Sequence, residues 1–215
     1  MNFGKVLLKI SKIITYFFHP VFLPFLLFLL LYFVAPLPLF FSFFTPKSFA
    51  AFLGVVFLYT IVFPLLFTFW LKKTKLISDF EISDGQERPK TYFMVSAFFI
   101  SLTYFFYSKG GLLGPASVIL GVISAIILGL GFFSYFSKIS AHTAAMAGIV
   151  GILAAIFIRF NENSLFIPIL ISISLTGLVA SSRLWLGAHS LKQIFWGWLW
   201  GITAGFSGIY FFLLK

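Results

Sequence analysis

The sequence has no cysteine and very few acidic residues. Of its 215 residues, 5 are Asp or Glu, and only 9% carry a charge. The absence of Cys excludes disulfides, thiolate metal sites and cysteine nucleophiles. Soluble domains average about 25% charged residues, so this composition excludes a soluble enzyme. Any chemistry must come from His, Ser, Lys, Arg or a carboxylate.

Apolar residues are abundant instead: 61% of the chain is hydrophobic, and 33 residues are Phe. Uncharged apolar runs of about 18 residues or more are typical of membrane-spanning helices. We therefore predict an all-α, polytopic transmembrane helix bundle of six to seven spans, forming one integral membrane domain over residues 1–215. The uncharged stretches are 13–46, 48–71, 91–108, 110–137, 139–158, 163–182 and 193–214.

The polar segments between these runs suggest where function lies. Residues 1–18 intersperse Lys with apolar residues, which indicates either an interfacial helix or a signal-like start, and we expect the segment to be retained. The main polar loop, 72–90, holds four of the five acidic residues: Asp79, Glu81, Asp84 and Glu87. If all seven stretches cross, the N-terminus, this loop and the junctions 138–142 and 182–192 lie on one face.

Two of the three histidines fall in those junctions. His142 begins the fifth span, and His189 precedes the seventh. An Arg, Lys or Asp at the centre of a membrane helix costs roughly 2.5–3.5 kcal/mol, so polar residues placed on one side favour a shared polar pocket over separate interfacial anchoring. His19, beside Pro20 at a membrane edge, is interpreted as an interfacial residue.

At this point the sequence resembles the type 2 phosphatidic acid phosphatase family. That family has three motifs, Lys-x6-Arg-Pro, Pro-Ser-Gly-His and Ser-Arg-x5-His-x3-Asp. This chain carries, in the same order, Arg88-Pro89, Ser140-Ala141-His142 and Ser182-Arg183-x5-His189-x3-Gln193. The third match, with its fixed spacing, is the most specific. The resemblance covers the chain from Arg88 to the C-terminus.

The resemblance implies a lipid-phosphate phosphatase that needs no metal or other cofactor. His189 would attack phosphorus to form a phosphohistidine, and His142 would protonate the departing lipid oxygen. Arg88 and Arg183 would bind the phosphate oxygens, with Ser140 and its neighbouring amides as further donors. The expected substrate is a lipid of the bilayer, such as phosphatidic acid, phosphatidylglycerol phosphate or a polyprenyl pyrophosphate.

Three departures from the family pattern count against ordinary activity. Glu81 stands where the family has Lys, Ala141 replaces Gly, and Gln193 replaces Asp. Gln193 follows His189 by four residues, so we expect its carbonyl to orient the imidazole without neutralising it, and Gln193→Asp or Gln193→Glu to raise turnover. The alternative function is a catalytically impaired binding or assembly subunit.

The acidic loop, the glycines and the tryptophans allow further predictions. The acidic loop could hold a divalent ion, but a solvated loop is favoured. Gly197, Gly201 and Gly205 predict close helix packing, internal rather than in a dimer seam, although a homodimer or a membrane-complex partner stays open. Four Trp near the last span predict an aromatic belt. These residues are Trp185, Trp196, Trp198 and Trp200.

The basic residues bear on partners and location. They are scattered at the ends of apolar runs, so no nucleic acid partner is expected. The resemblance implies a bacterial inner membrane, in which members of the family commonly face the periplasm. Eleven of the 15 basic residues fall on the predicted active face, which instead favours a cytoplasmic orientation. Without the five that could bind phosphate, the bias is feeble.

Overall fold

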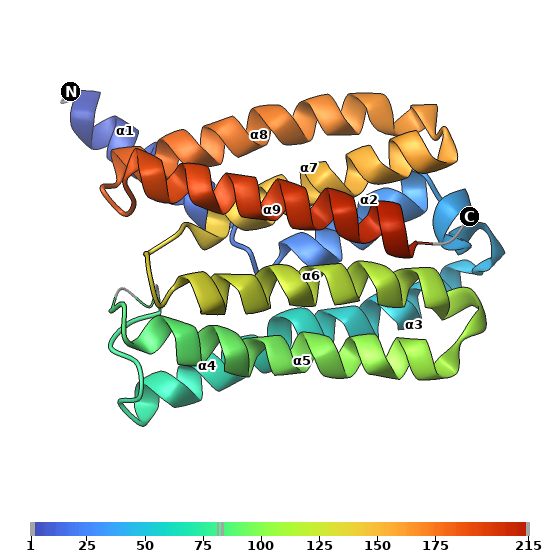
Figure 1. The fold of residues 1–215 in the computed structure, drawn as a ribbon, viewed down its shortest axis with the longest axis horizontal. Coiled ribbons are helices and arrows are strands. Elements are labelled where there is room, and N and C mark those ends of the chain that lie inside the picture. The colour runs from blue at the N-terminus through green and yellow to red at the C-terminus, as the bar shows by residue number, and fades with distance from the viewer. Residues whose placement is uncertain (1–2, 81, 83, 214–215) are drawn as a thin grey trace.

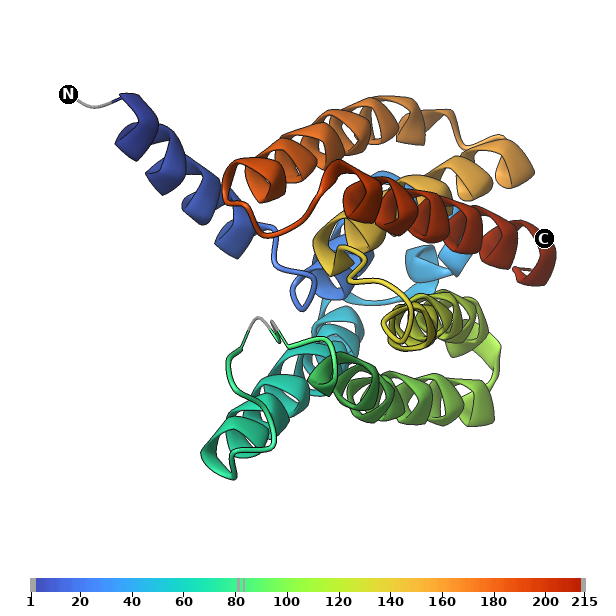
Figure 2. The same cartoon turned by 60° about the vertical axis from the view of Figure 1, so that its left-hand side comes forward.

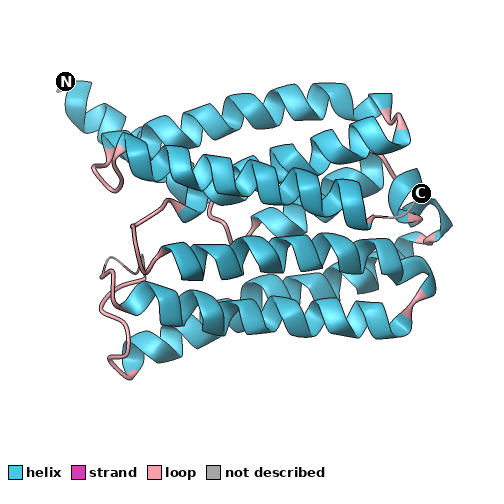
Figure 3. Ribbon diagram, viewed as in Figure 1, coloured by secondary structure: helices cyan, strands magenta, loops and turns pink. Residues whose placement is uncertain are grey.

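The fold is described from a computed structural model of residues 3–80, 82 and 84–213, and within those residues every regular element is helical (Figures 1 and 3). Short 3-10 turns join several helices, and the π-helical turn Leu58–Val62 joins α3 to α4. The predicted all-α fold is confirmed. The helices are α1 Phe3–Phe17, α2 Leu23–Val34, α3 Pro46–Phe57, α4 Phe63–Lys73, α5 Glu87–Lys109, α6 Gly114–Phe133, α7 Ala141–Phe160, α8 Phe166–Trp185 and α9 Leu191–Phe212.

Five helical segments of the described chain are long and apolar enough to cross a membrane. They correspond to α3 with α4, and to α5, α6, α7 and α8. Two of the seven predicted spans are not among these five segments. The helix of the first, α2, has only 12 residues, and that of the last, α9, has 22. The five long helices are typical of an integral membrane protein.

Successive long helices alternate in direction, so the connections gather at two ends (Figure 1). The N-terminus and the connections 74–86, 134–140 and 186–190 lie at one end, which we call the N-terminal end. The polar segments therefore share one end of the bundle, as predicted. Helix α1 projects from this end with Lys5, Lys9 and Lys12 exposed, and contacts α8 (Figure 2).

Helix α7 is the core of the bundle and packs most extensively against α9. In its apolar window 67% of residues are buried, against 17% for the segment containing α8. A Cβ added at Gly201 would collide with the carbonyl of Ala144, and one at Gly205 with the carbonyl of Gly148. The glycine ridge of α9 is thus an internal seam against α7, as predicted.

We expect Gly201→Ala to destabilise the protein, because the new methyl group meets the backbone of Ala144 with no flexible side chain to yield. Overpacking of this kind costs about 1–3 kcal/mol. Thermal unfolding in detergent checks this, with Gly177→Ala as control. Gly177 lies exposed on α8 with nothing within 4 Å of an added Cβ. If both variants unfold at the wild-type temperature, the seam is not tightly packed.

The aromatic-belt prediction needs correction for one tryptophan. The indole N–H of Trp200 donates to the carbonyl of Ile126 at 3.0 Å, and its ring packs against the ring of Phe133. Trp200 therefore joins α9 to α6 inside the bundle. Trp185, Trp196 and Trp198 are exposed.

Candidate functional site

A cavity of about 400 Å³ opens at the N-terminal end of the bundle. Its lining includes both histidines and both arginines that the sequence analysis singled out, together with Lys138 and His19. These two histidines and two arginines come from sequence positions up to 101 apart, and their convergence is as predicted. The residues are Arg88, His142, Arg183 and His189.

Helix ends place these four side chains. Arg88 lies in the first turn of α5 and His142 in the first turn of α7, while Arg183 lies in the last turn of α8. His189 lies in the connection that follows, where Gly187 has a positive φ of 64°. Such a φ suits glycine, which lets the chain turn sharply between α8 and α9.

A short backbone segment, residues 138–140, holds the site together, and we call it the strap. The Lys138 carbonyl lies 3.1 Å from Nδ1 of His189. The Ile139 carbonyl accepts a hydrogen bond from Nη2 of Arg88 at 2.9 Å. The Ser140 N–H donates to the carbonyl of Gln193 at 3.1 Å. The strap thereby fixes α5 and the start of α9 relative to α7.

The strap also determines the tautomer of His189. Because a carbonyl can only accept, Nδ1 of the neutral imidazole must carry the proton in this contact. Nε2 then keeps its lone pair. His189 thus has the form that a nucleophile requires.

The surroundings of His189 favour its neutral state. Burial has the largest effect and, with the charges of Arg183 and Arg88, lowers the pKa of His189 from 6.5 to about 4. The Lys138 carbonyl opposes this by stabilising the imidazolium. The net result is an unprotonated imidazole at neutral pH.

We expect the imidazole of His189 to titrate with a midpoint near its lowered pKa of about 4. NMR of ¹⁵N-histidine-labelled protein measures this, with His189→Gln assigning the signal. The unfolded chain keeps the ordinary pKa of about 6.5, so acidification from there down to the folded-state value favours unfolding. A midpoint near 6.5 would show that His189 is not buried beside the two arginines.

Arg88 is the most enclosed cation of the site, with 2% of its surface exposed. Its Nη2 also donates to the hydroxyl of Tyr92 at 3.0 Å. Within the described residues, Nε of Arg88 and Nε2 of His142 are buried without a hydrogen-bond partner. A buried polar group left in this state costs about 1–3 kcal/mol. An anion with several acceptor oxygens could satisfy the Arg88 donor, and a hydroxyl or oxygen ligand could pair with His142.

Ser140 does not have the predicted role. It is fully buried, its hydroxyl accepts from the Thr143 N–H at 3.4 Å, and it is absent from the cavity lining. Its own N–H is bound to Gln193, so Ser140 caps α7 and offers no donor to a substrate. The N–H groups of Ala141 and His142 lie in the first turn of α7, where no intrahelical carbonyl accepts them, so they are the backbone donors left at this helix end. Ala141 has no positive φ, so the change from Gly has no backbone cost.

The predicted contact of Gln193 with His189 is wrong. The side-chain oxygen of Gln193 accepts the Ser190 N–H at 3.0 Å, and the Ser190 hydroxyl accepts the Gln193 N–H at 3.4 Å. This reciprocal pair is a capping box that begins α9. The orienting acceptor for His189 is the Lys138 carbonyl.

The capping role changes the expected effect of substitutions at Gln193. We expect Gln193→Glu to keep turnover within about threefold, since Glu suits the same capping position, and not to raise it. Gln193→Ala removes the hydrogen bond to the Ser190 N–H, one half of the capping box, and is expected to lower stability by about 0.5–1.5 kcal/mol. Turnover and thermal unfolding, measured on both variants, separate these effects. A tenfold rise in turnover for Gln193→Glu would restore the original interpretation.

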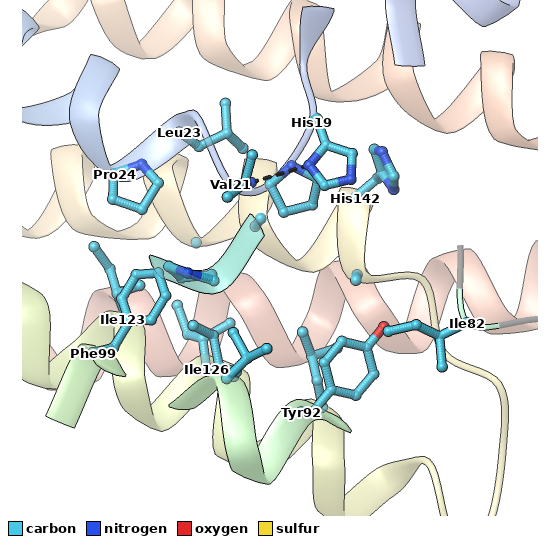
Figure 4. Close-up of a pocket in the computed structure, with 18 of the residues that line it drawn as sticks. His19, Val21, Leu23, Pro24, Ile82, Tyr92, Phe99, Ile123, Ile126 and His142 are labelled. Atoms are coloured by element: carbon cyan, nitrogen blue, oxygen red, sulfur yellow. Dashed lines mark hydrogen bonds between the residues drawn. The ribbon is translucent and has the colours of Figure 1, made fainter. Parts of the chain in front are cut away.

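Sequence reasoning missed His19 as a cavity residue. Its ring stands perpendicular to that of His142, with centroids 5.3 Å apart, and its Nδ1 accepts the Val21 N–H at 3.3 Å (Figure 4). The feature that could have identified His19 as a cavity residue is its position just before α2, at the end of the bundle where the cavity opens. Its position next to Pro20 suggested only a boundary.

The acidic loop gives no support to a metal site. The Glu87 carboxylate accepts from the N–H and hydroxyl of Ser78, and the Asp84 carboxylate accepts from the Gln86 N–H. In the part of the chain that the structure describes, no three His, Asp or Glu side chains form a group able to hold a metal ion. Glu81, which stands at the family's Lys position, lies outside the described residues.

The chain matches no protein-family model, no curated protein and no solved structure.

Proposed function

We propose that the chain is an integral membrane phosphatase that hydrolyses a phosphate or pyrophosphate headgroup of a lipid in the bacterial inner membrane, without a metal ion. The observation that supports this is the convergence of two histidines and two arginines in one cavity, with His189 neutral and oriented through Nδ1. Divergent membership of the type 2 phosphatidic acid phosphatase family is part of the proposal.

In the proposed reaction, Nε2 of His189 attacks phosphorus while the bond from phosphorus to the lipid oxygen breaks. His142 donates its proton to that oxygen, and Arg88 and Arg183 hold the phosphate oxygens. Water then attacks the phosphohistidine, passing a proton to His142 as the phosphorus–nitrogen bond breaks. Phosphate leaves, and both histidines return to their initial states.

One observation favours the alternative, a phosphatase-like binding or assembly subunit. The acceptor on Nδ1 of His189 is a neutral carbonyl. It orients the ring but gives the imidazolium none of the charge stabilisation that a carboxylate would give. Such a protein would bind lipid phosphates without turning them over.

The topology that accompanies the proposal has seven crossings, with α2 and α9 as the additional spans. In this proposal the excess of basic residues at the N-terminal end favours a cavity that faces the cytoplasm. In this Cys-free chain, labelling of Ser83→Cys by an impermeant reagent in intact cells would indicate the opposite orientation. Ser83 itself lies outside the described residues.

A lipid panel tests the activity. Purified protein in detergent is given phosphatidic acid, phosphatidylglycerol phosphate or a polyprenyl pyrophosphate, with and without chelator, and released phosphate is measured. The proposal expects release from at least one lipid, unchanged by chelator. Binding of these lipids without release would favour the assembly-subunit alternative.

A further inference from the structure

The cavity continues into the bundle well beyond the histidines and arginines. On α5 its lining residues are Arg88, Tyr92, Val95 and Phe99, spaced three or four residues apart and so on one helix face. The eleven steps from Arg88 to Phe99 rise about 16 Å at 1.5 Å per residue. The cavity therefore extends along the helix axes.

Helices α6 and α7 line the same depth. On α7 the lining runs from His142 through Ala145 to Ile152, which corresponds to a rise of about 15 Å. On the antiparallel α6 it runs from Leu130 to Ile123. The inner part is lined by apolar side chains, among which Figure 4 shows Phe99, Ile123 and Ile126 facing Leu23 and Pro24.

The charged and imidazole side chains of the lining lie at the outer end. Arg88, His142 and His189 lie within the first turn of a helix or in a connection at the N-terminal end. Farther in, the hydroxyl of Thr68 donates to its own helix at the Pro64 carbonyl, 2.9 Å away. The inner cavity thus suits a hydrocarbon chain joined to an anionic head.

We propose that the cavity binds one apolar chain of its substrate inside the protein, parallel to the helix axes, with the phosphate between His142 and His189. The assignment of the head rests on the proposed phosphatase function. A carbon–carbon bond of about 1.5 Å advances an extended chain by about 1.3 Å, so 15 Å takes roughly a dozen carbons. A cavity of about 400 Å³ is near the lower end for small-ligand sites, about 300–1,000 Å³. The substrate class is a lipid phosphate with one inserted chain, in preference to one with two.

Filling the inner cavity tests this. Ala145 lies one turn beyond His142, and Ala145→Phe places a ring in the path of the chain. The matched control is Ala97→Phe, on the exposed face of α5 and outside the cavity. The ratio of dodecyl phosphate to ethyl phosphate turnover should fall at least tenfold in Ala145→Phe and stay unchanged in Ala97→Phe. An unchanged ratio in both variants would overturn the chain site.

A measurement on the wild type needs neither activity nor a variant. A dodecylphosphonate with a diazirine on its terminal carbon is photolysed with the protein, and the adducts are mapped by mass spectrometry. The proposal expects adducts on Phe99, Ile123 or Ile152, suppressed by excess dodecylphosphonate. Adducts confined to outward-facing residues such as Phe105 and Ile171 would overturn it.

The two proposals fail separately. Inner-cavity adducts without phosphate release from any lipid would support the chain site and contradict the phosphatase function. Phosphate release with outward adducts only and an unchanged turnover ratio would support the phosphatase function and overturn the chain site.

Discussion

Replacing His189 with Ala is expected to abolish phosphate release from lipid phosphates, lowering kcat by roughly 10⁴-fold or more. In the proposed reaction the variant loses the atom that attacks phosphorus, which belongs to the imidazole that the strap orients through Nδ1. Phosphate release from wild type and variant, purified in the same detergent, measures the loss. His189 is the residue on which the proposed reaction depends most.

A second variant separates loss of the nucleophile from loss of the strap contact. His189→Asn keeps a side-chain N–H that can donate toward the Lys138 carbonyl, but an amide nitrogen is not nucleophilic. It should be as inactive as His189→Ala while unfolding closer to the wild-type temperature. Turnover within tenfold of wild type in either variant would show that His189 is not the nucleophile.

Arg88 is expected to produce the second-largest effect. Arg88→Lys keeps the positive charge but loses the planar fork that contacts Ile139 and Tyr92 and that, in the proposed reaction, binds the phosphate. Removing one preorganised donor from a charged transition state costs about 10²–10³ in rate, so we expect a loss of this size in kcat/KM. Lipid turnover across a range of substrate concentrations measures it.

The control for Arg88 lies at the opposite end of the bundle. Arg159, in the last turn of α7, donates through Nε to the carbonyl of Leu213 and does not line the cavity. Arg159→Lys should lose stability at most, with kcat/KM unchanged. Equal kcat/KM losses in the Arg88 and Arg159 variants would mean that both act through folding.

The helices were predictable because apolar runs and charges alternate along the chain. The first apolar run, 13–46, shows the limit of that signal. The prolines of this run predict a helix from about Pro20 to Ala35, whereas α2 covers Leu23–Val34 before 3-10 turns follow. Pro36 and Pro38 explain why the helix stops there. The π-helical turn at Leu58–Val62 has no comparable sequence signal.

The sequence predicted the parts of the site that are made by side chains, and not the parts that are made by the backbone. The placement of Arg183 and His189 on one predicted face indicated a shared pocket. The strap carbonyls that hold His189 and Arg88 gave no such signal, because they are backbone groups present at every residue. The contact expected between His189 and Gln193 assumed that both lie on one helix. His189 instead precedes Ser190, the N-cap of α9, so the four-residue rule does not hold there.

Trapping the covalent intermediate tests the central proposal most directly. The protein is mixed with ³²P-labelled phosphatidic acid, phosphatidylglycerol phosphate or polyprenyl pyrophosphate, quenched in alkali, in which phosphohistidine survives, and digested for mass spectrometry. We predict label on the peptide containing His189, lost during a chase with unlabelled lipid and absent from His189→Asn. Phosphate release without label on His189, or label on another residue, would contradict the proposed mechanism.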